Sequence, residues 1–153
     1  MSKAFNQADR SQIAEAMKPI LAESAQLYVA TQNVHWNVTG PLFQAVHALT
    51  EEQYLELAPA IDEIAERIRG LGQKAPGTMT QYMALGSIKD GDENAGAEDM
   101  IRALKEGHNT IADHIRPVIA AAAEANDEVT AGLLTDRLTV HEKAQWMLGA
   151  MLD

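Results

Sequence analysis

The chain has 153 residues, contains no cysteine and carries a formal net charge of −10 at pH 7. This length fits one domain with a sizeable core, and we expect a single domain over residues 1–153 with a short N-terminal extension at 1–10. The absence of cysteine excludes disulfides, thiol nucleophiles and thiolate metal sites, so any metal must be held by His, Asp or Glu. The negative charge disfavours nucleic acid and anionic lipid as partners and favours cations.

The hydropathy pattern indicates no targeting or membrane segment. Residues 1–10 contain no long apolar run, and no stretch of about 18 consecutive apolar residues occurs in the chain. We therefore expect a soluble cytoplasmic protein with no membrane association.

The first predicted helix carries apolar residues at three- and four-residue steps between positions 13 and 38, which places them on one face. Gly40 and Pro41 end it. Pro19 lies inside the pattern, so the helix either begins there or is kinked there. A second helix follows from about 43 to 71, with Pro59 expected to bend it and Gly70 and Gly72 at its end.

A long connection separates the second helix from the next strong pattern. It contains one predicted short helix, Met79–Leu85, followed by a polar loop at 87–94. A third helix covers about 100–119, with Pro117 as a predicted kink. Asn126 is predicted to cap the fourth helix, whose first turn holds Asp127 and Glu128 at the positive end of the helix dipole. Four helices with one long crossover and no strand signal predict an all-α, ferritin-like four-helix bundle.

The second helix carries a stripe of side chains that can bind metal. His47, Glu51, Asp62 and Glu66 fall within roughly 100° of one another when each residue turns the helix by about 100°. Glu51 and Asp62 are nonetheless roughly 16 Å apart along the helix, so one chain cannot bring both ends of the stripe to one ion.

A two-fold dimer with antiparallel second helices would close two equivalent sites. His47 and Glu51 of one subunit would face Asp62 and Glu66 of the other, and His35 before the Gly40 turn would join the histidine end. This mixture of imidazole and carboxylate suits an iron ion with open positions.

The same residues form a longer ordered series that resembles a known family, the Dps proteins (DNA-binding proteins from starved cells). The series comprises His35-Trp36-Asn37-Val38-Thr39-Gly40-Pro41-Leu42-Phe43, then His47, Glu51, Asp62-Glu63-Ile64-Ala65-Glu66-Arg67 and Leu71-Gly72. The resemblance covers essentially the whole chain. It implies a dodecamer, a hollow shell of twelve subunits that is built from two-fold dimers.

The resemblance also implies a function. Ferroxidase centres at the dimer interfaces would use His35 and His47 of one subunit with Asp62 and Glu66 of its partner, and Glu51 matches a carboxylate that accompanies His47. Ferrous iron would be oxidised by hydrogen peroxide, with dioxygen slower, and ferric oxide would be stored in the shell, which protects against oxidative damage.

Several further residues have two interpretations from sequence. Asp62 and Glu66 could instead form ion pairs with Arg67 and Arg69 on a solvated face. Glu52, Glu56 and Glu63 either face the mineral cavity or are ordinary surface residues. Asp127 and Asp136 either line an entry pore or, for Asp127, cap a helix. Trp36 and Trp146 either quench oxidising equivalents near the centre or, for Trp146, pack at an interface. We expect His108, His114 and His141 to be structural or surface residues. The acidic loop from Asp90 is not a calcium loop, because Ala95 and Ile101 replace its essential glycine and final carboxylate.

Two other functions compete with iron oxidation. A DNA-compacting protein needs basic tails, but residues 1–10 offer only Lys3 and Arg10 against Asp9, and twelve copies at −10 each carry −120. Direct DNA binding is therefore unfavourable. A different dimetal enzyme, such as a manganese catalase, would draw Glu-x-x-His pairs from one bundle, and no such pair occurs at matching positions.

Overall fold

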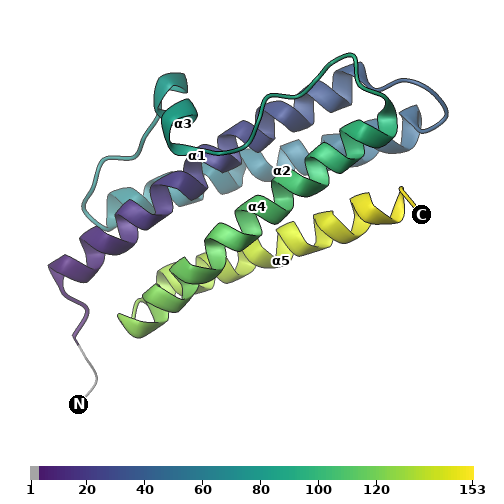
Figure 1. The fold of residues 1–153 in the computed structure, drawn as a ribbon. Coiled ribbons are helices and arrows are strands. Elements are labelled where there is room, and N and C mark those ends of the chain that lie inside the picture. Colours follow the sequence, from purple (N-terminus) through teal and green to yellow (C-terminus); the bar gives the residue numbers. More distant parts are fainter. Residues whose placement is uncertain (1–3) are drawn as a thin grey trace.

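Two helical hairpins pack side by side in the computed structural model, which describes residues 4–153 (Figure 1). The first hairpin pairs α1 (Gln7–Asn37) with α2 (Phe43–Gly70), and the second pairs α4 (Ala97–Glu124) with α5 (Glu128–Ala150). The crossover with α3 (Met79–Leu85) runs along α1, so that α4 starts at the end of the bundle where α2 started. No strand occurs within residues 4–153, and the predicted four-helix bundle with a short crossover helix is confirmed.

The start of the first helix differs from the expectation. The helix begins at Gln7, where the Asn6 side chain accepts a hydrogen bond from the Asp9 backbone N–H at 2.9 Å. Positions 7–10 are therefore helical and not part of an extension, while residues 1–3 of that predicted extension lie outside the described residues. Pro19 lies inside α1, so the helix does not begin there.

The start of the last helix also corrects the prediction by one residue. The cap is Asp127, whose carboxylate accepts from the Thr130 backbone N–H at 3.0 Å. Asn126 has a φ of 61°, the left-handed conformation that asparagine tolerates better than most residues and that commonly ends a helix. Asn126 therefore belongs to the turn that ends α4, and the residue after it caps α5.

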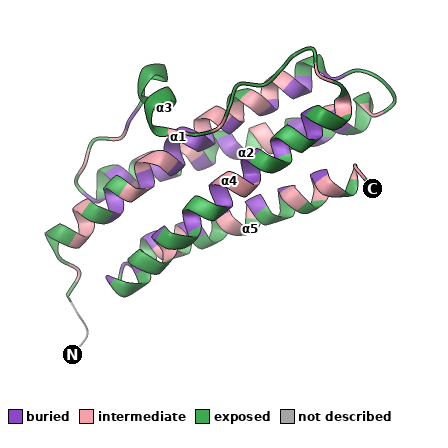
Figure 2. Ribbon diagram, in the orientation of Figure 1, coloured by how far each residue is buried: buried purple, intermediate pink, exposed green. Residues whose placement is uncertain are grey.

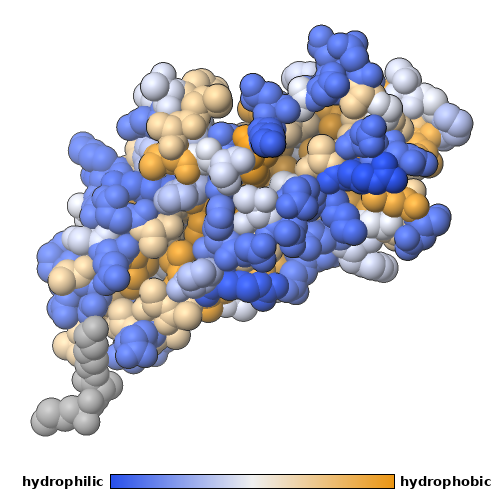
Figure 3. All heavy atoms as spheres, viewed as in Figure 1, coloured by the Kyte–Doolittle hydropathy of each residue, from blue (hydrophilic) through white to orange (hydrophobic). Residues whose placement is uncertain are grey.

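The core lies between the two hairpins, where the apolar stripes of all four long helices meet (Figure 2). Ile13, Leu21, Ile64, Ile111 and Leu134 are among its fully buried members. Burial of each such side chain contributes about 1.5–3 kcal/mol to the free energy of folding. None of the long helices among residues 4–153 combines the length and apolar character needed to cross a membrane, and hydrophilic residues cover much of the face shown in Figure 3.

Polar side chains of α1 fasten the crossover to the bundle. The buried Glu23 carboxylate accepts from the Ser87 hydroxyl at 2.9 Å and from His114 Nδ1 at 2.8 Å. The amide group of Gln26 donates to the carbonyl oxygen of Tyr82 at 3.3 Å and accepts from the Ile88 backbone N–H at 3.2 Å, and a Cβ at Gly86 would meet its far end. A larger residue at position 86 would therefore displace the Gln26 side chain.

A buried histidine pair joins the second hairpin internally. The Nδ1 atoms of His108 on α4 and His141 on α5 are 2.9 Å apart, and both side chains are almost completely buried. Burial, with a smaller effect of the nearby Arg137 charge, lowers the pKa of His108 to about 4. Burial first, then His108 and Arg137, lowers the pKa of His141 well below 6.5. Both rings are therefore neutral at pH 7.

This pair makes the stability of the fold sensitive to acid. Below pH 6.5 the unfolded chain takes up protons that the folded chain does not bind until about pH 4, so stability is lost as pH falls through this window. We expect His108 alone to lower the free energy of unfolding by about 2 kcal/mol between pH 7 and pH 5. Urea unfolding at fixed protein concentration measures this change.

The matched variant is the double replacement His108→Leu with His141→Leu, which removes both partners together, so that neither ring is left buried without the other. Its stability should fall less than that of the wild type between the same two pH values. An equal fall in both proteins would show that these histidines are not neutral in the fold.

Candidate metal centre

The two predicted histidine ligands meet at the turn between α1 and α2. His35 lies in the last turn of α1 and His47 in the first turns of α2, and Gly40 allows the turn between them with a φ of 93°. Their imidazole rings stack with centroids 3.7 Å apart and planes 13° apart. The chain reversal therefore brings together two residues twelve positions apart.

Each histidine is held by the backbone of the other. His35 Nδ1 is 2.7 Å from the carbonyl oxygen of His47, and His47 Nδ1 is 2.8 Å from the carbonyl oxygen of His35. A carbonyl oxygen only accepts hydrogen bonds, so both Nδ1 atoms must carry the proton. In the neutral rings both Nε2 atoms then have a free lone pair, which is the form of histidine that binds a metal ion.

The surroundings of the pair fix the two rings further. Thr50 is fully buried on α2, and its hydroxyl oxygen lies 3.2 Å from His35 Nδ1. The ring of Tyr54 packs edge-on against His35 with a distance of 5.2 Å between ring centroids, and the ring of Phe43 stacks on His47 with a centroid distance of 5.1 Å. His35 is only 6% exposed, whereas His47 is partly exposed, so the pair is accessible chiefly from the side of α2.

The three predicted carboxylate ligands are exposed on α2. Glu51 is one helical turn beyond His47, whereas Asp62 and Glu66 lie in the half of the helix that ends at Gly70. Within residues 4–153 of one chain, no three metal-binding side chains come close enough to hold an ion. The structure thus brings His35 and His47 together and leaves Asp62 and Glu66 apart from them.

The competing ion pairs for Asp62 and Glu66 do not form in the described part of the chain. Arg67 donates to Asp127 and Thr130, both at 2.9 Å, and Arg69 donates to the carbonyl of Gln73 at 3.0 Å. The arginines that could have neutralised the stripe are therefore bound elsewhere.

Two other residues with open interpretations have structural partners. Glu56 binds the guanidinium of Arg137 at 2.6 Å, a contact that neither interpretation of this residue included. Asp127 caps α5 and pairs with Arg67, which favours capping over a pore. Trp36 and Trp146 are 66% and 69% exposed near the C-terminal ends of α1 and α5, which lie at the same end of the bundle.

Sequence reasoning missed the residues that orient the histidines. Thr50 and Tyr54 follow His47 by three and seven positions, so they lie on the same face of α2. That spacing was a usable signal, because a threonine and an aromatic beside a metal-binding histidine are typical supporting residues. The reciprocal bonds to backbone carbonyls had no sequence signal.

Comparison with known proteins agrees with this fold. Residues 14–153 match the ferritin-like domain family. Antigen TpF1 of Treponema pallidum is 36% identical over 92% of this chain and 80% of its own length, and DNA protection during starvation protein 2 of Bacillus anthracis is 35% identical over 93% and 97%. A crystal structure of a Dps protein from Vibrio cholerae, described as a member of a superfamily of ferritin-like diiron-carboxylate proteins, superimposes with a TM-score of 0.92 at 29% identity over 100% of this chain and 98% of that one.

The four-helix fold and the family match over residues 14–153 thus define a ferritin-like helical bundle. Within that class, the identity over nearly the full length of named relatives decides the family. The chain belongs to the Dps family of ferritin-like proteins.

The reciprocal carbonyl bonds predict one tautomer for both histidines. In metal-free protein at pH 8, His35 and His47 should both be protonated at Nδ1 and unprotonated at Nε2, because each Nδ1 faces a carbonyl oxygen. Solid-state NMR of protein with 15N-labelled histidine distinguishes the two ring nitrogens. A proton on Nε2 of either residue would contradict the arrangement.

Proposed function

We propose that this protein is a ferroxidase that oxidises ferrous iron with hydrogen peroxide and stores the ferric product in a shell of identical subunits. The observation that carries the proposal is the histidine pair, whose Nδ1 atoms are held by carbonyl oxygens and whose Nε2 lone pairs are free for a metal. Nitrogen ligands beside exposed carboxylates suit ferrous iron and leave positions open for the oxidant.

The complete centre would be formed between two subunits. His47 and Asp62 are fifteen positions apart on one helix, which corresponds to about 22 Å. An isologous two-fold contact between antiparallel α2 helices would place Asp62 and Glu66 of one subunit against His35 and His47 of the other. Such dimers, six to a shell, would give the dodecamer that the family resemblance implies.

The reaction balances without another redox partner. Each of two ferrous ions gives up one electron, the O–O bond of hydrogen peroxide breaks, and two protons complete two water molecules. Because both electrons leave in one event, no hydroxyl radical is released. The ferric ions prefer oxygen ligands, so the carboxylates of Glu51, Asp62 and Glu66 would hold the product until hydrolysis forms the oxide.

The competing functions have less support. The interior of a single bundle is unsuited to a dimetal centre, because the buried Arg137 supplies a fixed positive charge there and no three metal-binding side chains gather within residues 4–153. Direct DNA binding is opposed by the charge of −10 per chain. The same negative charge would raise the local concentration of ferrous ions and help them to reach a cytoplasmic shell.

The proposal predicts the effect of removing one ligand from each end of the stripe. Ferrous iron is added anaerobically to apo-protein, hydrogen peroxide follows, and ferric absorbance is recorded at low iron loading. His47→Ala and Asp62→Ala should each slow the initial oxidation by at least about tenfold, because each removes a direct ligand.

The matched control is Glu63→Ala, which removes an exposed carboxylate that follows Asp62 but is turned from it by about 100° around the helix, outside the stripe. It should change the initial rate by less than about twofold. Size-exclusion chromatography confirms that all variants assemble alike. Unchanged rates in both ligand variants, with assembly intact, would refute the proposed centre.

A further inference from the structure

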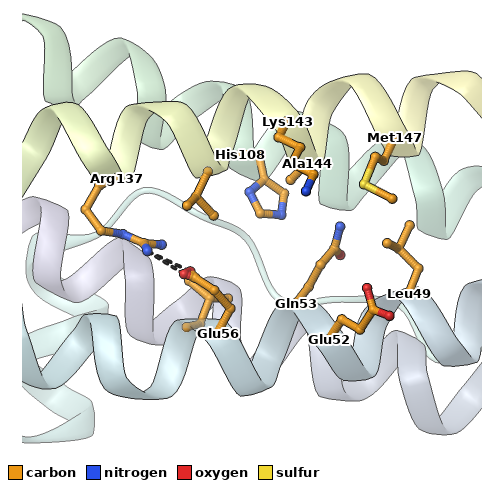
Figure 4. Close-up of a pocket in the computed structure, with 11 residues that line it drawn as sticks. Leu49, Glu52, Gln53, Glu56, His108, Arg137, Lys143, Ala144 and Met147 are labelled. Atoms are coloured by element: carbon orange, nitrogen blue, oxygen red, sulfur yellow. Dashed lines mark hydrogen bonds and ion pairs between the residues drawn. The ribbon is translucent and has the colours of Figure 1, made fainter.

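A cavity of about 150 Å³ lies between α2 and α5, on the opposite face of α2 from His47 (Figure 4). These two helices make few contacts with each other, and side chains of α2, α4 and α5 line the space between them. Gln53 projects from α2, Arg137 and Lys143 project from α5, and His108 of α4 lies behind them. Apolar side chains, including Leu49 and Met147, form the remaining walls.

Arg137 is bound along only one part of its guanidinium group. Its Nη1 atom donates to the Glu56 carboxylate, at 2.6 Å to one of the oxygens, and the residue is 5% exposed. Its Nε and Nη2 atoms are buried and have no partner within residues 4–153. These two atoms form the planar edge on which arginine binds carboxylates and other oxyanions in a bidentate manner.

Other atoms around the cavity are also buried and unpartnered in the described chain. They are both atoms of the Gln53 side-chain amide and Nε2 of His108. One neutral ring donates its Nδ1 proton to the Nδ1 atom of the other; with His141 as the donor, His108 carries its only ring proton on Nε2. Leaving buried donors unpaired is costly, so the cavity is suited to a molecule rich in acceptors.

The balance of donors decides which kind of ligand fits. The charges at the cavity are Arg137 and Lys143 against Glu56 and Glu52, so net charge alone selects neither a cation nor an anion. The free hydrogen-bonding atoms are mostly donors, and Glu56 is already bound by the opposite edge of Arg137. A metal ion is disfavoured, because the guanidinium group of Arg137 is positively charged and residues 4–153 offer no cluster of metal ligands.

We propose that this cavity binds one small inorganic oxyanion, of phosphate or bicarbonate size, on the free edge of Arg137. The side-chain amide of Gln53 and the Nε2–H of His108 donate hydrogen bonds to the remaining oxygens of the anion. The positive charge of Lys143 on α5 attracts the anion. The site belongs to each single bundle, so it does not depend on the ferroxidase centre or on iron.

Calorimetric titration of metal-free, assembled protein with inorganic phosphate in Tris chloride buffer tests the site. We expect saturable binding with one phosphate per chain. Arg137→Lys keeps the positive charge but removes the bidentate edge, and it should weaken binding by at least about tenfold. Lys143→Met should weaken it about two- to fivefold, since this side chain is exposed.

Lys89→Met is the matched control, because it removes one exposed positive charge on the crossover and should leave binding unchanged. Gln53→Leu provides a second test inside the cavity if Arg137→Lys fails to fold. Competition by bicarbonate or by sulfate then shows whether a planar or a tetrahedral anion is preferred. Absence of saturable binding, or equal binding by all variants, would overturn the proposal and show that the cavity holds water only.

Discussion

The two ends of the α2 stripe lie on one continuous helix, about 22 Å apart, and a helix cannot fold back on itself to bring them together. This constraint determines what a single subunit can do. The subunit presents a pair of oriented imidazoles at one end of α2 and two exposed carboxylates toward the other. Each half is incomplete as a metal site, so the proposed activity requires the proposed assembly of two subunits.

The bundle interior shows why the metal chemistry would lie at an interface and not in the core. The space between the hairpins holds two neutral histidines and an arginine paired with Glu56. No three metal-binding side chains gather there within residues 4–153. The hydrogen bond between His108 and His141 joins α4 to α5, and the ion pair between Arg137 and Glu56 joins α5 to α2. The interior polar residues therefore support the fold, and the proposed metal site lies on the exposed face of α2.

The sequence predicted the fold well because helical periodicity, the glycines of the turns and the polar crossover are local signals. It failed by one residue at Asn126 and by several at the start of α1, where a cap is chosen by backbone geometry and not by residue type alone. The pairing of His35 with His47 was predictable from the turn between them. The partners of Arg67 and Arg137 were not, because they lie about sixty and eighty positions away in sequence.

Subunit complementation tests the shared centre most directly. A chain carrying His47→Ala and a chain carrying Asp62→Ala are each expected to be inactive when assembled alone. When the two are co-expressed in equal amounts, a mixed dimer has one centre with both changes and one centre with neither, so about a quarter of all centres should be intact with random pairing. Recovery of about that fraction of the peroxide-dependent oxidation rate is the predicted result. If the mixture stays as inactive as its two components, although mass spectrometry shows mixed dimers, the centre is not shared between subunits.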